Sequence, residues 1–257
     1  MRKFAFVTRS DEKSNVIASY MREKLITGGM EESDHPELVI CIGGDGTILS
    51  AVHEYLETLN QVQFLGIHTG TLGFLTDYTQ NEIEDAIHAI LTIQPDVFES
   101  RLLEITTKGN VATYYALNEM RIENVIHTQI MDIKIDDELF ETCRGTGICL
   151  STQAGSTAYN RSLRGAVIDS GLSVMQLCEI TGIQNSIHRS LSVPYLMKEN
   201  RIVDFYSQTF DEAVLCYDHL YASLKGVTQV TCKMSDKTVR FSRYRPYSYL
   251  KRLKNLY

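Results

Sequence analysis

The sequence has no apolar run near the 18 residues of a membrane-spanning helix, and no CxxC pair among its six cysteines. Its seven histidines include no HExxH or HxxxH pair, so we expect no transition metal held by protein side chains. Most cysteines lie in apolar runs, as buried free thiols of a reducing cytoplasm do. The apolar stretch near the N-terminus is short and followed by charge, so we expect no export signal.

A net charge of −7 argues against a general nucleic-acid binder, although it leaves room for a local phosphate site. Basic residues gather only in the tail, which carries Arg240, Arg243, Arg245, Lys251, Arg252 and Lys254. We interpret this tail as a solvated helix face or as a helix C-terminus whose cations complement the helix dipole, with a phosphate contact or a subunit contact as the alternative. We expect neither a nucleic-acid partner nor a membrane partner.

Strands and helices alternate over roughly the first hundred residues, which indicates an α/β domain. Apolar runs predict strands at 3–8 and 37–42, and the segment 63–75 predicts a third strand followed by another glycine turn. The run at 37–42 is continuous, as in a parallel strand buried on both faces. Helical spacing of apolar residues predicts helices over Ser10–Leu25, 48–59 and 81–91.

Short alternating runs dominate from Leu102 onward and predict an antiparallel β-sandwich. Asp136 and Asp137 separate two such runs and indicate a hairpin turn. We expect one helix to interrupt these strands over roughly 171–180, and a last short helix after Pro246.

The segment ICIGGDGTILSAV, residues 40–52, places a glycine-rich turn between an apolar strand and an amphipathic helix. Such a turn points backbone N–H groups and the positive helix end at one place, which suits a phosphate. It is neither a Walker A loop nor a Rossmann fingerprint, and a carboxylate, Asp45, stands in its middle. We interpret Asp45 as a general base facing a hydroxyl, or as a ligand of nucleotide-borne magnesium. The alternative is a simple helix cap.

Two later segments suit a nucleoside. In ALNEMRIE, the Glu119 carboxylate can accept from ribose hydroxyls while the Asn118 amide reads a base edge, although most such pairs are surface residues. The segment CRGTGICLSTQAGSTAYNRS, residues 143–162, is rich in small and hydroxyl side chains, and Tyr159 can stack on an aromatic ring. The alternative is a turn with a helix cap and Tyr159 in the core.

Taken in order, GGDGT, HTGTLGF (68–74), LNE (117–119) and GSTAYN (155–160) resemble the bacterial type of NAD kinase, over nearly the whole chain. GGDGT alone is shared with phosphofructokinases and lipid kinases, whereas the two later motifs single out NAD kinases. The resemblance implies phosphorylation of the 2′-hydroxyl of the adenosine ribose of NAD, giving NADP. The donor would be ATP with Mg²⁺, or polyphosphate.

The same resemblance implies a Rossmann-like three-layer α/β nucleotide-binding domain over 1–98 that the tail 240–257 rejoins. It implies an all-β sandwich over 99–239 that binds NAD, and a homodimer or homotetramer. Asp45 would accept the proton, and Gly43, Gly44, Gly46 and Thr47 would approach the donor phosphates. The residues expected to bind NAD are Asp45, Gly46, Phe74, Asn118, Glu119, Arg144, Thr146, Thr157, Ala158, Tyr159, Asn160, Arg161, Ser162 and Thr181, with Asp218 and His219 as further candidates.

Three positions depart from the family pattern. Thr146 stands where the family has the aspartate of GDG, and it can accept through one oxygen only. Gln153 replaces a proline and loosens a rigid turn, and Arg164 replaces a glycine. These departures keep a second hypothesis open, a non-catalytic NAD(P)-binding protein derived from such a kinase. A lipid or sugar kinase would share only the GGDGT loop.

Overall fold

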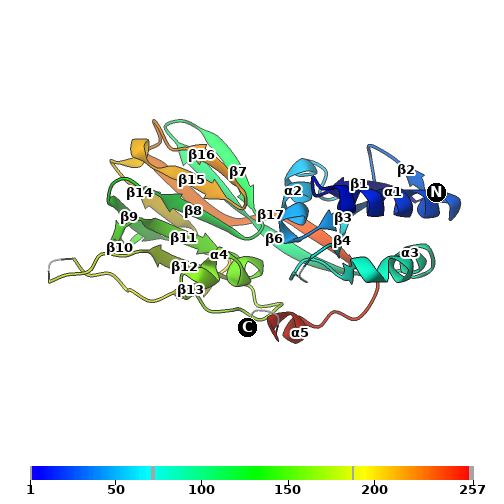
Figure 1. Ribbon diagram of the computed structural model, residues 1–257. Coiled ribbons are helices and arrows are strands. Elements are labelled where there is room, and N and C mark those ends of the chain that lie inside the picture. Colours follow the sequence, from blue (N-terminus) through cyan, green and yellow to red (C-terminus); the bar gives the residue numbers. More distant parts are fainter. Residues whose placement is uncertain (1, 71–72, 187, 255–257) are drawn as a thin grey trace. The chain divides into compact units, whose positions relative to one another are not determined.

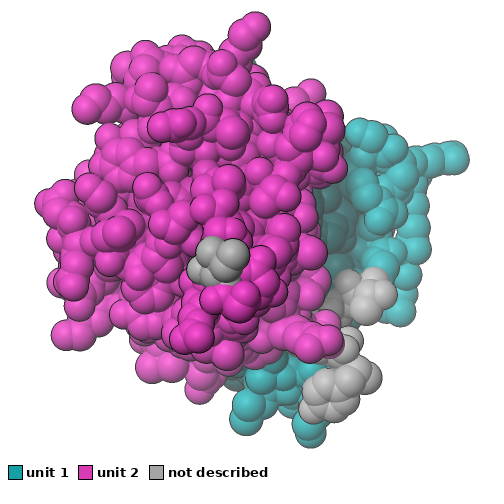
Figure 2. All heavy atoms as spheres, turned by 90° about the vertical axis from the view of Figure 1, so that its left-hand side faces the viewer, with its two compact units in different colours: residues 1–100, 237–257 teal, residues 101–236 magenta. Residues whose placement is uncertain are grey.

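The computed structural model describes residues 2–70, 73–186 and 188–254, so Thr71 and Leu72 of the HTGTLGF motif lie outside the described residues. The chain forms two compact units, residues 1–100 with 237–257 (unit 1) and residues 101–236 (unit 2) (Figure 2). It passes from unit 1 to unit 2 within strand β6 (Asp96–Lys108) and returns within β17 (Gln229–Arg243) (Figure 1). No helix among the described residues is long and apolar enough to cross a membrane.

Unit 1 is built on a parallel sheet in the order β17–β4–β3–β1–β2, with β5 also beside β4. Its remaining strands are β1 (Lys3–Thr8), β2 (Glu31–Glu32), β3 (Leu38–Gly43), β4 (Gln63–His68) and β5 (Tyr78–Thr79). Every residue of β3 is buried, because helices cover both faces of the sheet.

The helical elements of unit 1 are α1 (Glu12–Thr27), α2 (Asp45–Glu54), the 3-10 turn η1 (Gln80–Glu82), α3 (Ile83–Thr92) and α5 (Tyr249–Leu253). Helices α1 and α3 share one core with Leu38 and Ile40 of the sheet. Helix α2 covers the opposite face, where Ile48 fills the space beside Gly66. The predicted three-layer α/β architecture is therefore confirmed, as is the short helix after Pro246.

Unit 2 is a sandwich of two antiparallel sheets, ordered β10–β9–β14–β17–β6–β7 and β13–β12–β11–β8–β15–β16. Its other strands are β7 (Ala112–Ala116), β8 (Glu119–Glu123), β9 (Gln129–Ile135), β10 (Glu138–Gly145), β11 (Gly147–Ser151), β12 (Val174–Ile180), β13 (Tyr195–Lys198), β14 (Val203–Tyr206), β15 (Val214–Tyr217) and β16 (Leu220–Ser223). Three short helical turns complete it, η2 (Ala154–Thr157), α4 (Tyr159–Ser162) and η3 (Phe210–Glu212). Apolar side chains of both sheets form one core, as the sandwich prediction requires.

The structure corrects the helix predicted over 171–180. Residues Val174–Ile180 form strand β12, which pairs with β11 on one side and β13 on the other. Met, Gln and Leu in this run favour a helix in isolation, but pairing along both edges of the strand outweighs that local preference. The hairpin prediction is confirmed, because Asp136 and Asp137 adopt φ values of 50° and 67° in the two-residue turn between β9 and β10.

Two boundaries in unit 1 also differ from the predictions. Helix α1 is capped by Asp11, whose carboxylate accepts from the N–H of Ser14, and not by Ser10. Helix α2 spans Asp45–Glu54, whereas the sequence predicted a helix over 48–59. The strand predicted within 63–75 is confirmed as β4, which ends at His68.

Candidate active site

The GGDGT segment forms the turn from β3 into α2, and the helix begins at Asp45 itself. The N–H of Gly44 donates to the hydroxyl of Thr47 at 3.3 Å, which closes the first turn. A side chain at Gly44 or Gly46 would meet no atom within 4 Å. The start of α2 therefore leaves room for an anion to approach the backbone closely.

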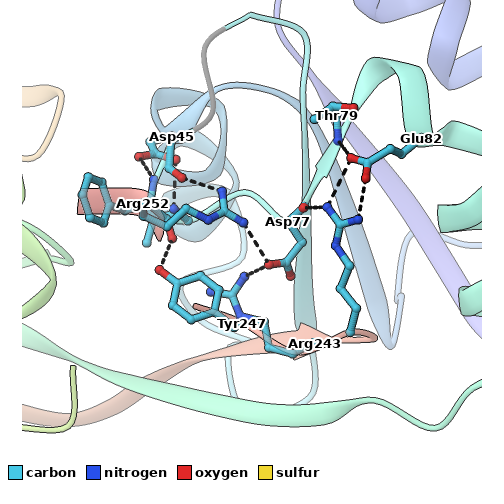
Figure 3. Close-up of polar contacts among 11 residues, drawn as sticks. Asp45, Asp77, Thr79, Glu82, Arg243, Tyr247 and Arg252 are labelled. Atoms are coloured by element: carbon cyan, nitrogen blue, oxygen red, sulfur yellow. Dashed lines mark hydrogen bonds and ion pairs between the residues drawn. The ribbon is translucent and has the colours of Figure 1, made fainter. Parts of the chain in front are cut away.

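The carboxylate of Asp45 binds a neighbouring loop (Figure 3). Its Oδ2 accepts from the N–H of Phe74 at 2.8 Å, and its Oδ1 accepts from the N–H of Leu75 at 3.0 Å. Each carboxylate oxygen can accept about two hydrogen bonds, so each retains room for another donor. Asp45 is half-buried, and the two loop amides fix the orientation of its carboxylate.

In unit 2, Asn118 and Glu119 stand where β7 turns into β8. The carboxylate of Asp218 accepts from the N–H of Leu117 at 2.8 Å and from the N–H of Asn118 at 2.7 Å. The Thr152 hydroxyl donates to the carbonyl of Leu117 at 2.6 Å. Asp218 and Thr152 thus fix the backbone of this turn through three hydrogen bonds.

The Glu119 carboxyl group is only 5% exposed, and its Oε2 has no hydrogen-bond partner in the part of the chain that the structure describes. Burial and the charge of Asp218 raise the pKa of Glu119 to about 7, against the opposing effect of the Arg121 guanidinium. A buried carboxyl oxygen without a partner is suited to accept a hydrogen bond from a ligand hydroxyl or amine.

The GSTAYN segment forms η2 and α4 and packs directly on the Asn118 turn. A side chain at Gly155 would come within 2.0 Å of the carbonyl oxygen of Asn118, so only glycine permits this approach. The guanidinium of Arg121 lies over the ring of Tyr159, 3.9 Å from its centroid. Tyr159 is half-buried, and it is held on one face by Arg121.

Other residues of the same segment have distinct surroundings. Asn160 is fully buried and its amide bonds the loop backbone and the Cys178 thiol, which holds the loop together. Thr157 and Ala158 are half-buried, whereas Arg161 and Ser162 are exposed.

The structure accommodates two of the departures from the family pattern. Gln153 donates to the carbonyl of Ile168 at 2.9 Å, a bond that proline cannot make. Arg164 adopts a φ of 62°, in the left-handed region where glycine is favoured. The predicted candidate His219 is exposed beside the buried Asp218.

Arg144, Thr146 and Thr181 lie apart from this cluster within unit 2. Thr146 directly precedes β11, whereas Glu119 pairs with Ser151 at the far end of that strand. Four residues separate Thr146 from Ser151, so the two positions lie roughly 17 Å apart along the strand. The structure therefore does not bring these three residues to the Asn118 turn of their own chain.

Several residues at these sites had no sequence signal of their own. No motif assigns a role to Arg121 or Thr152. Two tail residues, Arg252 and Tyr247, bind the loop that contacts Asp45. The prediction of a solvated face is wrong for Arg252, because that residue is 7% exposed, although Arg252 does stand in the last turn of α5, where a cation complements the helix dipole. Its partner Gly73 lies 179 positions earlier, so no local pattern indicates the contact.

The fold matches solved structures over the whole chain. Yeast NADH kinase complexed with NADH superposes with a TM-score of 0.84 at 17% identity, covering 100% of this chain and 87% of that one. An NAD kinase from Archaeoglobus fulgidus in complex with ATP gives a TM-score of 0.73 at 21% identity, covering 100% and 97%. At these identities the matches establish the fold.

The sequence comparisons are more specific. The ATP-NAD kinase N-terminal domain matches residues 5–94, and the ATP-NAD kinase C-terminal domain matches residues 115–232. The NAD kinase of Geobacillus stearothermophilus is 36% identical over 257 residues, covering 98% of this chain and 95% of that protein. NAD kinase 1 of Bacillus subtilis (strain 168) is 36% identical over 258 residues, covering 98% and 97%. The chain belongs to the NAD kinase family.

Proposed function

We propose that this chain phosphorylates the 2′-hydroxyl of the adenosine ribose of NAD, with ATP as the donor, to give NADP. Its membership of the NAD kinase family supports the overall reaction, and disfavours the non-catalytic alternative. The observation that carries the chemistry is the orientation of Asp45. Two backbone N–H groups hold its carboxylate at the start of α2, beside glycines that leave the backbone accessible.

In the proposed reaction Asp45 accepts the proton of the ribose hydroxyl as the hydroxyl oxygen attacks the γ-phosphorus of ATP. A bond forms between that oxygen and phosphorus, the bond from the γ-phosphorus to the bridging oxygen breaks, and ADP leaves. A carboxylate is a weak base, but the loose transition state of phosphoryl transfer depends more on positioning than on basicity. Asp45 therefore faces a hydroxyl, which removes the conflict between a carboxylate and a phosphate loop.

The donor phosphates would lie against Gly43, Gly44, Gly46 and Thr47, where the helix start favours negative charge. Magnesium ordinarily keeps most of its contacts to substrate phosphates and water, with one or two carboxylates from the protein. No three His, Cys, Asp or Glu side chains among the described residues gather to hold a metal ion. We therefore propose that Mg²⁺ arrives with the triphosphate and is held through the donor phosphates beside Gly44 and Gly46, while Asp45 faces the ribose hydroxyl.

The adenosine part of NAD would bind unit 2. The unpartnered Oε2 of Glu119 is suited to a ribose hydroxyl, and the Asn118 amide to a base edge. The Tyr159 ring would border an aromatic ring of the ligand, although it also packs against Arg121 and the cluster of Cys149, Cys178 and Ile180. The half-buried residues Thr157 and Ala158 would line the dinucleotide. Phe74 stays a candidate nucleotide contact of unit 1.

Arg144, Thr146 and Thr181 would serve the site of a neighbouring subunit in a homodimer or homotetramer, since they lie at the far end of β11. Co-expression of Asp45→Asn and Arg144→Ala chains tests this arrangement. If the sites are shared, each mixed dimer has one intact site of two, and random pairing makes about half of the dimers mixed. The co-expressed population should then regain about a quarter of the wild-type activity, although each variant alone is impaired. A cytoplasmic location is supported by six free cysteines.

The decisive experiment is a coupled assay for NADP, with ATP and polyphosphate as parallel donors, beside calorimetry with NAD. Asp45→Asn should keep NAD affinity and lose about 10²–10⁴-fold in turnover, the usual contribution of a positioned general base. Asp85→Asn, an exposed aspartate of α3, is the matched control. Unchanged turnover in Asp45→Asn would remove the proposed role. NAD binding by the wild type without NADP formation from any donor would favour the non-catalytic hypothesis.

A further inference from the structure

The loop that orients Asp45 is itself bound by the C-terminal tail of unit 1 (Figure 3). The guanidinium of Arg252 donates from Nη1 to the carbonyl of Gly73 at 2.7 Å, and the hydroxyl of Tyr247 donates to the carbonyl of Phe74 at 2.9 Å. Phe74 is therefore fixed on both sides of its backbone. Its N–H binds Asp45 and its carbonyl binds Tyr247.

A buried carboxylate anchors the tail to the same loop. Asp77 is 3% exposed and is hydrogen-bonded to Arg243, and its Oδ1 lies 3.7 Å from Nη2 of Arg252. Arg245 donates to the Asp77 carbonyl and to the Glu82 carboxylate, the latter at 2.6 Å. These ion pairs are largely removed from solvent at Asp77, so their geometry is held more firmly than in a surface pair.

Aromatic rings add further contacts within the tail and between the tail and the loop. The guanidinium of Arg243 lies 4.3 Å from the ring centroid of Tyr247, and that of Arg252 lies 5.3 Å from the same centroid. The ring of Tyr249 meets that of Phe74 with centroids 5.6 Å apart. The tail thus offers a rigid surface to the loop.

The loop also approaches Asp45 as closely as a backbone can. A side chain at Gly73 would come within 2.1 Å of Oδ1 of Asp45. A small shift of this loop would therefore change the position of the carboxylate.

Resting on the proposed function, we propose that Arg252 and Tyr247 are positioning residues for Asp45. They fix the carbonyls of Gly73 and Phe74, and so aim the following N–H groups at the carboxylate. Their hydrogen bonds go to the loop backbone, so they act on Asp45 through the loop. Because a displacement of about 1 Å at a reacting group can cost 10²-fold in rate, this support has a measurable effect on turnover.

The test compares Arg252→Gln and Tyr247→Phe with Lys251→Gln, which removes the same charge from the exposed neighbour in α5. We expect kcat to fall by about 10–100-fold in Arg252→Gln. We expect a fall of about threefold to tenfold in Tyr247→Phe, which loses one hydrogen bond. KM for NAD should stay within about twofold of wild type, because neither side chain is proposed to touch substrate. Arg252→Lys should restore part of the lost turnover, and Lys251→Gln should match wild type.

A second readout, amide hydrogen exchange of residues 73–77, does not depend on activity. The Phe74 and Leu75 amides should exchange faster in both test variants than in Lys251→Gln. Equal exchange and equal kcat in Arg252→Gln and Lys251→Gln would overturn the proposal, as would a raised KM with unchanged kcat. If Arg252→Gln fails to fold, Tyr247→Phe decides, because it keeps the ring. A wild type without turnover would count against the proposed function, while the exchange measurement would still test the positioning.

Discussion

Units 1 and 2 each contain an aspartate that binds two consecutive backbone N–H groups of a neighbouring turn. Asp45 binds those of residues 74–75 in unit 1, and Asp218 binds those of residues 117–118 in unit 2. Asp45 is half-buried and retains room for a ligand, whereas Asp218 is 8% exposed and lies beneath the turn. The same hydrogen-bond arrangement therefore orients the acid proposed as the base in one unit and, in the other, supports the turn that carries a second acid, Glu119.

The glycines of the two loops differ in the same way. Gly44 and Gly46 face space that no protein atom occupies within 4 Å, whereas Gly155 lies against the carbonyl of Asn118. The glycines of the first loop leave open space, which we propose a ligand fills, whereas the glycine of the second loop permits a close contact within the chain. Four predictions test this contrast.

The largest expected effect concerns the pH dependence of stability in unit 2. The folded state raises the pKa of Glu119 from its ordinary 4.5 to about 7, so the folded chain holds this proton more tightly than the unfolded chain. The free energy of unfolding should therefore fall as pH rises from 4.5 to 7, by about 3 kcal/mol. Glu119→Gln should abolish this slope.

Urea unfolding at pH 5 and pH 8 measures the difference between wild type and Glu119→Gln. Glu31→Gln, an exposed glutamate of unit 1, serves as the control and should follow wild type. If the free energy of unfolding of Glu119→Gln changed with pH as it does in wild type, folding would not raise the pKa of Glu119. The contrast with Asp45 would then weaken.

Gly155→Ala should destabilise unit 2 by about 2 kcal/mol, because the added methyl meets a backbone carbonyl that cannot move aside cheaply. The displaced Asn118 turn should also bind NAD more weakly. Chemical denaturation and calorimetry with NAD check both effects. Wild-type stability with wild-type NAD affinity would show that the two segments do not need this close approach.

Arg164→Gly should stabilise the chain by about 1 kcal/mol, because it relieves a left-handed backbone conformation at φ 62°. Arg161→Gly, in the neighbouring α4, should instead destabilise it by about the usual helical cost of glycine, ~1 kcal/mol. Thermal unfolding of the two variants should thus shift in opposite directions. Shifts of the same sign would show that the backbone at position 164 is not strained.

The smallest effect on stability is expected for Gly46→Ala in the open loop. No atom lies within 4 Å of the added methyl, and alanine favours the first turn of α2, so stability should rise by about 0.5 kcal/mol. KM for ATP should rise nevertheless, because the methyl takes space proposed for the donor phosphates. An unchanged KM for ATP would place the donor elsewhere.

The layers of both units were predictable because they follow from local patterns. A continuous apolar run marks β3, and Asp136–Asp137 marks a hairpin, wherever the rest of the chain lies. Val174–Ile180 was misread as a helix, since its pairing with β11 and β13 leaves no trace in its own composition. Local propensity predicts a helix or strand correctly only where the tertiary contacts of that segment favour the same secondary structure.

The candidate site was predictable in its motif residues but not in their supports. Asp45 is conspicuous among glycines, yet its partner Phe74 lies 29 positions away and Arg252 binds from farther still. The raised pKa of Glu119 depends on burial and on the charge of Asp218, and both arise only on folding. The sequence shows which ionisable side chains are present. Their orientation and pKa depend on contacts with residues far away in the sequence, which only the structure shows.

Unit 2 is one uninterrupted segment, whereas unit 1 is assembled from two segments that flank it. During synthesis the residues of unit 2 therefore leave the ribosome before Phe241, through which β17 joins β4, and before Arg252, which binds Gly73. A nascent chain thus carries Asp45 and the loop that binds it well before the tail residues that hold that loop. We expect the loop amides to exchange faster until those tail residues have been made.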